Sequence, residues 1–156
     1  MSLDAPTIEI RTESPVAAGS RRLIAASQTE IEKVYPPDQI FSLSAEDLAT
    51  PNTQFIVARL DDVPIGCIAL VDMLRYGEMK RLFVTKSARG HGLGRALVEE
   101  VENAARDIGL RVLRLETGPK LEPAVALYKR LGYRERGRFG GYDDLPCSLF
   151  MEKSLG

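Results

Sequence analysis

The sequence predicts an α/β (α+β) fold in which a mixed, mostly antiparallel sheet of about six or seven strands is flanked by about four helices. Three observations lead to this prediction. The predicted elements follow the order βα(α)βββαβαββ, so that helices separate some strands but not others. Two strands between residues 55 and 71 are joined by a short turn, which makes them antiparallel. The 156 residues, 44% apolar and 28% charged, suit one globular core, and we expect a single domain over residues 1–156.

The first third of the chain predicts one strand and two helices. Thr7–Arg11 alternates between polar and apolar residues, as a half-buried strand does. From Ser20 to Lys33, apolar residues recur at helical spacing, and Pro36-Pro37 ends that helix. Ser42–Leu48 predicts a short second helix.

Three strands are predicted next. Phe55–Leu60 and Ile65–Val71 are joined by a turn over residues 61–64 and form a hairpin. Gly77–Thr85 is a third strand, but its apolar residues do not alternate strictly. This pattern indicates either burial on both faces or a β-bulge, and the sequence leaves both open.

A loop over residues 86–95 precedes a long amphipathic helix that Gly109 ends. The apolar stripe of this helix is Leu93, Leu97, Val101, Ala104, Ala105 and Ile108, and its polar face is Glu99, Glu100, Glu102, Asn103, Arg106 and Asp107. Arg111–Glu116 then predicts a strand. A last helix has Pro123 near its first turn, carries a stripe at Ala124, Leu127, Tyr128 and Leu131, and ends at Gly132. Arg134–Phe139 and Cys147–Glu152 are the closing strands.

Composition excludes several classes of function. The 21 basic and 22 acidic residues give a net charge of −1, which argues against a nucleic-acid binder held by phosphate charge. No apolar run is long enough to span a membrane, and the first residues do not resemble a signal peptide. Two cysteines, Cys67 and Cys147, and one histidine are too few for a structural zinc site. We expect no metal, and reduced, buried thiols in a cytoplasmic protein.

Gly90, Gly92 and Gly94 lie between a predicted strand and a predicted helix. Glycine allows positive φ and close approach to the backbone, and the helix N-terminus offers free N–H groups. Together these features predict a phosphate or pyrophosphate site, although a tight turn alone would also need glycine. The loop is neither a P-loop nor a dinucleotide fingerprint, because Arg95-Ala96 stands where those motifs need Lys-Ser/Thr or a third glycine.

Residues 89–94, Arg-Gly-His-Gly-Leu-Gly, resemble the Arg/Gln-x-x-Gly-x-Gly/Ala signature of the GNAT N-acetyltransferases. The resemblance extends upstream to the strand over residues 78–84. Downstream, residues 124–133 resemble the family's Ala-x-x-Leu-Tyr-x-x-x-Gly-Phe/Tyr element. These motifs cover residues 76–133, and the predicted order of elements matches that of the family over nearly the whole chain.

The resemblance implies that acetyl-CoA is the cosubstrate. Its pyrophosphate would bind the backbone N–H groups of the loop, where two arginine side chains could add charge, and its pantetheine arm would lie along the free edge of the preceding strand. A backbone N–H of that strand could also polarise the thioester carbonyl. The cofactor-binding residues implied are Leu82, Phe83, Val84, Arg89, Gly90, His91, Gly92, Leu93, Gly94, Arg95 and Tyr128.

Direct acetyl transfer needs a proton donor for the thiolate and a base for the amine. The resemblance implies that Tyr128 is the donor, although core packing alone would also explain it. Glu78 is the implied base; a salt-bridge partner of Lys80 or Arg81 is the simpler alternative. Glu116 is a reserve base and Asp72 a weaker one. We expect neither His91 as a base nor a covalent acetyl-cysteine.

The family often has Asn seven residues before its tyrosine, where this chain has Leu121, so one cofactor contact is in doubt and the loop over residues 117–122 could be rearranged.

The acceptor side is expected near the first helices, Tyr76, Thr117 and residues 139–144. The resemblance implies an N-acetyltransferase acting on a primary amine of a small molecule, amino acid or peptide. A non-catalytic acyl-CoA-binding or regulatory module is the alternative, and a nucleotide-phosphate binder is a third hypothesis. The C-terminal strands could form a homodimer, which the sequence does not decide.

Overall fold

The computed structural model describes residues 7–156 and contains one seven-stranded sheet in the order β1-β2-β3-β4-β5-β7-β6. Its strands are β1 Ile8–Thr12, β2 Thr53–Leu60, β3 Val63–Asp72, β4 Gly77–Val84, β5 Val112–Thr117, β6 Arg134–Arg136 and β7 Leu149–Ser154. Every neighbouring pair is antiparallel except β4 and β5. The mixed, mostly antiparallel sheet predicted from the sequence is confirmed.

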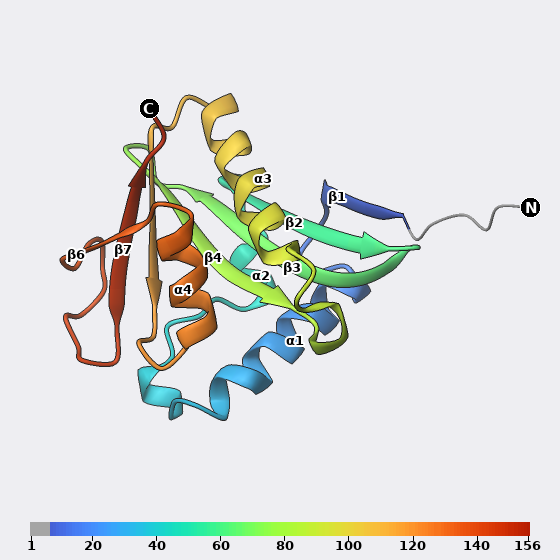
Figure 1. Ribbon diagram of the computed structural model, residues 1–156, viewed down its shortest axis with the longest axis horizontal. Helices are drawn as coiled ribbons and strands as arrows, with labels where there is room; N and C mark the ends of the chain where they lie inside the picture. Colours follow the sequence, from blue (N-terminus) through green and yellow to red (C-terminus); the bar gives the residue numbers. More distant parts are fainter. Residues whose placement is uncertain (1–6) are drawn as a thin grey trace, which may run out of the picture.

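The helices cover both faces of this sheet (Figure 1). They are α1 Ala18–Glu32, α2 Ala45–Leu48, α3 Leu93–Asp107 and α4 Glu122–Arg130, with short 3-10 turns η1 Pro37–Gln39 and η2 Lys86–Ala88. The larger core lies between the sheet and α3 and α4, whereas a smaller core lies under α1 and α2. None of the helices in residues 7–156 is long and apolar enough to cross a membrane.

Arg81 marks a β-bulge in β4. Its φ of +58° lies in the left-handed region. Across the ladder, Cys67 pairs with Phe83 and Ala69 pairs with Lys80, so that two residues of β4 oppose one of β3. The strand also contributes to both cores, Met79 to the larger one and Phe83 to the smaller one. The two alternatives that the sequence left open, a bulge and burial on both faces, are therefore both present and together account for the broken alternation.

β4 and β5 separate after a short stretch of parallel pairing. Only Gly77–Met79 of β4 pairs with Leu113–Leu115 of β5. Both strands continue beyond that point, β4 to Val84 and β5 to Thr117, without pairing to each other. The carboxyl end of β4 therefore has a free edge, and the two strands enclose a wedge-shaped space.

Two positions in α3 differ from the predicted amphipathic pattern. Glu102, placed on the polar face, is only 6% exposed; it accepts hydrogen bonds from the hydroxyl of Tyr133 and from Nζ of Lys153, both at 2.8 Å. Ile108, placed in the apolar stripe, follows the last helical residue and is 45% exposed. Burial of the Glu102 carboxylate is tolerated because these two donors form hydrogen bonds with it. Helical periodicity does not reveal such distant partners.

The two closing strands also have different limits from those predicted. β6 ends at Arg136 instead of Phe139, and β7 begins at Leu149 instead of Cys147. The chain between them forms an irregular segment over residues 137–148 that carries Phe139 and Tyr142 onto the sheet, where both rings pack on Phe150 of β7. Aromatic contacts with a neighbouring strand hold this segment, and local strand propensity does not predict them.

Candidate functional site

The glycine loop has the backbone geometry of an anion site. Gly90 and Gly92 have φ of +84° and +78°, and an added Cβ at either position would meet no atom within 4 Å. Gly92 is the N-cap of α3 and makes no side-chain capping hydrogen bond. Among residues 7–156, no backbone or side-chain acceptor is bonded to the amides of residues 90–95. These amides at a helix N-terminus can bind the pyrophosphate of a nucleotide cofactor.

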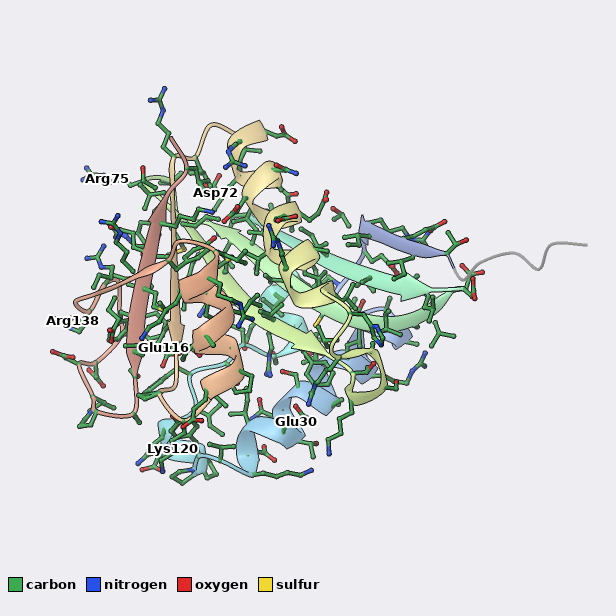
Figure 2. All side chains as sticks on the ribbon, viewed as in Figure 1. Glu30, Asp72, Arg75, Glu116, Lys120 and Arg138 are labelled. Carbon is green, nitrogen blue, oxygen red and sulfur yellow. The ribbon has the colours of Figure 1, made fainter. Side chains whose placement is uncertain are left out.

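The two arginine side chains of the loop are engaged elsewhere. Arg89 pairs with Glu30 of α1 at 2.6 Å, and its Nε donates to the carbonyl oxygen of Val84 at 2.9 Å (Glu30 is labelled in Figure 2). Arg95 pairs with Glu99 one helical turn on, at 2.9 Å. The ion pair of Arg89 therefore ties the loop to α1, and the backbone amides are the unengaged donors. His91 is exposed in the same loop.

A cavity occupies the space between the diverging ends of β4 and β5. It is walled by α1, by residues 39–42, by Met79–Leu82 of β4, by Glu116–Gly118 and by α4. The free edge of β4 thus forms one wall, where Leu82 lines the cavity and Phe83 and Val84 do not. In that edge Leu82 and Val84 pack toward the core under α3 and α4, whereas Phe83 is buried under α1.

Tyr128 lies on the α4 side of this cavity. It is 7% exposed and packs edge-to-face on Tyr133 with ring centroids 5.9 Å apart. Its hydroxyl bonds to no other group of residues 7–156, although the ring lines the cavity. Burial raises the pKa of Tyr128 well above its ordinary value, so its hydroxyl keeps its proton at neutral pH. The residue thus combines a packed ring with a protonated hydroxyl at the cavity.

Glu78 is 4% exposed and does not line the cavity. Its Oε2 accepts a hydrogen bond from the hydroxyl of Tyr142 at 2.5 Å and forms an ion pair with Nζ of Lys80 at 2.8 Å. Lys80 also donates to the hydroxyl of Tyr142. The three groups form a closed cluster, in which Lys80 alone borders the cavity.

Glu116, near the carboxyl end of β5, does line the cavity (Figure 2). It accepts a hydrogen bond from the hydroxyl of Ser148 at 2.8 Å. Burial raises the pKa of Glu116 to about 7, against the opposing effects of the Ser148 hydrogen bond and the Lys80 charge. A carboxylate with this pKa can accept and release a proton near neutral pH.

Several residues at the cavity were not predicted from the sequence. Tyr35, at the end of the first helical region, accepts a hydrogen bond from the amide of Lys120 at 2.8 Å. A side chain at Gly118 would overlap the ring of Tyr35, so this position requires glycine. The contact holds the loop before α4, where Leu121 serves as N-cap and lines the cavity.

The remaining candidates are placed as follows. Cys67 is buried, and burial raises the pKa of its thiol to about 12. Cys147 was expected to be a buried strand residue; it lies outside β7, is partly exposed and lines the cavity. Asp72 lies at the end of β3, where its carboxylate caps a turn at the amide of Leu74, 2.9 Å away. Among residues 7–156, no three His, Cys, Asp or Glu side chains gather in a way that could hold a metal ion.

The glycine loop, the separated strands and the tyrosine helix lie within one stretch of the chain that matches a known family. Residues 21–133 match the model of the acetyltransferase (GNAT) family. This chain belongs to the GNAT family. It is an acyltransferase, as the sequence resemblance implied.

Curated relatives of this GNAT chain are acetyltransferases. The chain is 41% identical over 152 residues to an IAA acetyltransferase of Azospirillum brasilense, covering 96% of this chain and 99% of the relative. It is 33% identical over 123 residues to YsnE, an uncharacterised N-acetyltransferase of Bacillus subtilis (strain 168), covering 77% and 82% of the two chains.

Solved structures show the same fold. A Klebsiella pneumoniae protein, provisionally described as an acyl-CoA N-acyltransferase, is 33% identical with a TM-score of 0.81 over 96% of this chain and 98% of its own. The PaiA N-acetyltransferase of Thermoplasma acidophilum, solved in complex with coenzyme A, has a TM-score of 0.78 over 95% and 99% of the two chains at 21% identity.

Proposed function

We propose that this GNAT acetyltransferase transfers the acetyl group of acetyl-CoA directly to a primary amine of a small molecule, amino acid or peptide. The cavity at the separated ends of β4 and β5 carries the proposal, because Tyr128 borders it on one side and Glu116 on the other. The coenzyme A bound to the PaiA structure and the names of the two relatives, both acetyltransferases, support the choice of cosubstrate.

In this mechanism the loop amides of residues 90–95 bind the pyrophosphate, and the pantetheine arm follows the free edge of β4 at residues 82–84. A backbone N–H of that edge polarises the thioester carbonyl as the amine attacks. Tyr128 donates a proton to the departing thiolate, and its hydroxyl is restored by the proton that the attacking nitrogen loses as the amide forms. The reaction also needs a base, which takes a proton from the ammonium form of the acceptor before the amine attacks.

Glu116 is the base that we propose, in place of the sequence-based choice Glu78. Glu116 borders the cavity and has a pKa of about 7, which suits proton transfer at neutral pH. Glu78 is held by Tyr142 and Lys80 and lies behind them. In this proposal Glu78 positions Lys80 and Tyr142 and does not touch the substrate.

The test is acetyl-CoA turnover with a panel of amines, amino acids and short peptides, followed by thiol release and by the mass of the products. The expected result is a product that carries one added acetyl group on nitrogen. Thermal unfolding with acetyl-CoA, CoA and ATP is the accompanying binding measurement. Saturation at 100 times the dissociation constant adds about 2.7 kcal/mol to the stability, and ATP is expected to give no shift.

Binding and turnover together separate this proposal from its rivals. A shift with both CoA species but no acetylated amine would support the non-catalytic acyl-CoA-binding module. A shift with ATP alone would support a nucleotide-phosphate binder. Neither outcome is expected for a chain with Tyr128 and Glu116 at the same cavity.

A further inference from the structure

Arg81 carries a positive charge that no described carboxylate balances. The residue lies at the bulge of β4, and its half-buried side chain lines the cavity. It also borders a second, more open cavity between α1 and α2, whose lining includes Glu46 and Asp47. Its Nε donates to the carbonyl oxygen of Leu43 at 3.0 Å, its Nη1 to the hydroxyl of Ser27 at 3.3 Å and its Nη2 to Oε1 of Gln28 at 2.8 Å. All three acceptors are neutral. Within residues 7–156, no Asp or Glu forms an ion pair with Arg81.

Some N–H donors of the Arg81 guanidinium therefore have no acceptor within residues 7–156. An arginine has five N–H donors, and three are used by these acceptors. The three bonds also fix the plane of the group against α1 and residue 43. A fixed, charged fork with unused donors at a cavity wall is suited to a planar anion.

The other charges at the cavity leave this one uncompensated. Lys80 also borders the cavity, but Glu78 neutralises it at 2.8 Å. Glu116 borders the cavity without forming an ion pair with Arg81. With the carboxylate of Glu116 assigned to the amine of the acceptor, the charge that remains without a counterpart at the wall is the single positive charge of Arg81, which a carboxylate matches better than a phosphate dianion.

Acetyl-CoA does not supply that anion in the mechanism proposed above. Its pyrophosphate is assigned to the glycine loop, beyond the carboxyl end of β4, and its ribose 3′-phosphate is at the adenosine end, farther still from the thioester. The pantetheine arm and the acetyl group are neutral. The acceptor is the remaining molecule that enters the cavity, so the negative charge must belong to the acceptor.

We propose that the acceptor is an amine that also carries a carboxylate, and that Arg81 binds this carboxylate while the amine faces Glu116. The inference rests on the proposed function and narrows it to amino-acid-like substrates. The free carboxylate of the acceptor then determines specificity, and a neutral amide at that position leaves the half-buried guanidinium without a counter-ion. Such a mismatch disfavours the neutral analogue strongly.

The experiment compares matched acceptors with acetyl-CoA. Each amino acid is assayed beside its primary carboxamide and beside the amine that lacks the carboxyl group. We expect kcat/KM for the preferred acid to exceed that of both analogues by at least about tenfold. The same comparison is made with Arg81→Gln, in which the expected preference falls to about onefold, and with Arg81→Lys, which restores it in part. Arg106→Gln, an exposed residue of α3, is the control for loss of one positive charge.

Two results would overturn the inference. One is equal or faster acetylation of the carboxamides by the wild-type protein. The other is an undiminished preference for the acid in folded Arg81→Gln. The first comparison uses only the wild-type protein, so the inference stays testable where the variant fails to fold.

A separate readout distinguishes failure of this inference from failure of the proposed function. Thermal unfolding is measured with CoA and each acid or carboxamide, without any turnover. A stabilising shift for acids alone, lost in Arg81→Gln, supports the carboxylate site even where no amine is acetylated. Equal shifts, or no shift for any acid, contradict it. Turnover of amines that lack a carboxylate with a kcat/KM equal to or above that of the acids would contradict the inference and leave the acetyltransferase function standing.

Discussion

The hydroxyl of Tyr142 lies 2.5 Å from Oε2 of Glu78, although 64 positions separate the two residues in the chain. Tyr142 belongs to the irregular segment between β6 and β7, and its ring packs on Phe150 with centroids 5.7 Å apart. With Lys80 at 2.8 Å, the contact leaves Glu78 enclosed and fully engaged. Glu78, the strand carboxylate that the resemblance implied as the base, therefore has contacts typical of a structural residue.

Glu78→Gln is expected to destabilise the protein more than it alters the chemistry. The substitution keeps the shape of the side chain but leaves Lys80 without its counter-ion, a loss of roughly 3 kcal/mol where a buried pair is broken. Thermal unfolding measures the loss. The rise of kcat/KM with pH should persist but move to lower pH, because the charge of Glu78 no longer raises the pKa of Glu116. A pH profile that becomes flat in Glu78→Gln would restore Glu78 as the base.

Glu116→Gln is expected to lower kcat by about 10²-fold, the usual contribution of a general base. In the wild type, kcat/KM should rise with pH through about 7, because Glu116 must be ionised to accept a proton. The variant should lack this rise. The measurement is the pH–rate profile of both proteins with one acceptor amine.

Stability against pH gives a second readout for Glu116. Its pKa is about 7 in the folded protein against an ordinary value of 4.5, so the folded state retains a proton that the unfolded chain releases. Stability should therefore fall as pH rises from about 4.5 to about 7 and change little above that. The difference in stability between wild type and Glu116→Gln should follow this window, and a difference independent of pH would contradict the assigned pKa.

Gly92→Ala should weaken CoA binding, with Gly109→Ala as its matched control. The two glycines have φ of +78° and +84° and open space around them, so alanine should cost about 1–2 kcal/mol of stability at either position. Only Gly92 lies in the loop that offers free amides. Titration with CoA should show a raised Kd for the first variant alone, and equal values of Kd for both would show that the loop is a turn only.

Tyr128→Phe should lower kcat by about 10²-fold while leaving the Kd for CoA unchanged. The phenyl ring keeps the packing on Tyr133, so only the hydroxyl is lost. Tyr133→Phe is the control: it removes a hydrogen bond to Glu102 and should lower stability without a comparable loss of rate. An unchanged turnover in Tyr128→Phe would remove the proton-donor role.

The elements that the sequence predicted well are those with strong local signals. The amphipathic α3, the hairpin of β2 and β3 and the glycine loop depend on periodicity, turn residues and glycine positions, all of which are local. The burial of Glu102 was missed because its two partners, Tyr133 and Lys153, are distant in the sequence.

The candidate site shows the same limit. The loop and Tyr128 could be identified from motifs, whereas the enclosure of Glu78 depends on Tyr142, and the exposure of Glu116 to the cavity depends on where β4 and β5 separate. The role of Arg81 could not be predicted either, because the sequence contains 21 basic and 22 acidic residues. Only the folded chain shows which arginine forms no ion pair with a carboxylate. Long-range pairing therefore decides which of the candidate acids faces the substrate.

The most direct test of the account is the order of acetyl transfer, measured as initial rates while acetyl-CoA and the acceptor amine are both varied. Direct transfer within one cavity predicts intersecting double-reciprocal lines, and an intact protein mass that does not change on incubation with acetyl-CoA alone. Parallel lines, together with an acetyl group retained on Cys147, which also lines the cavity, would contradict direct transfer and indicate a covalent intermediate.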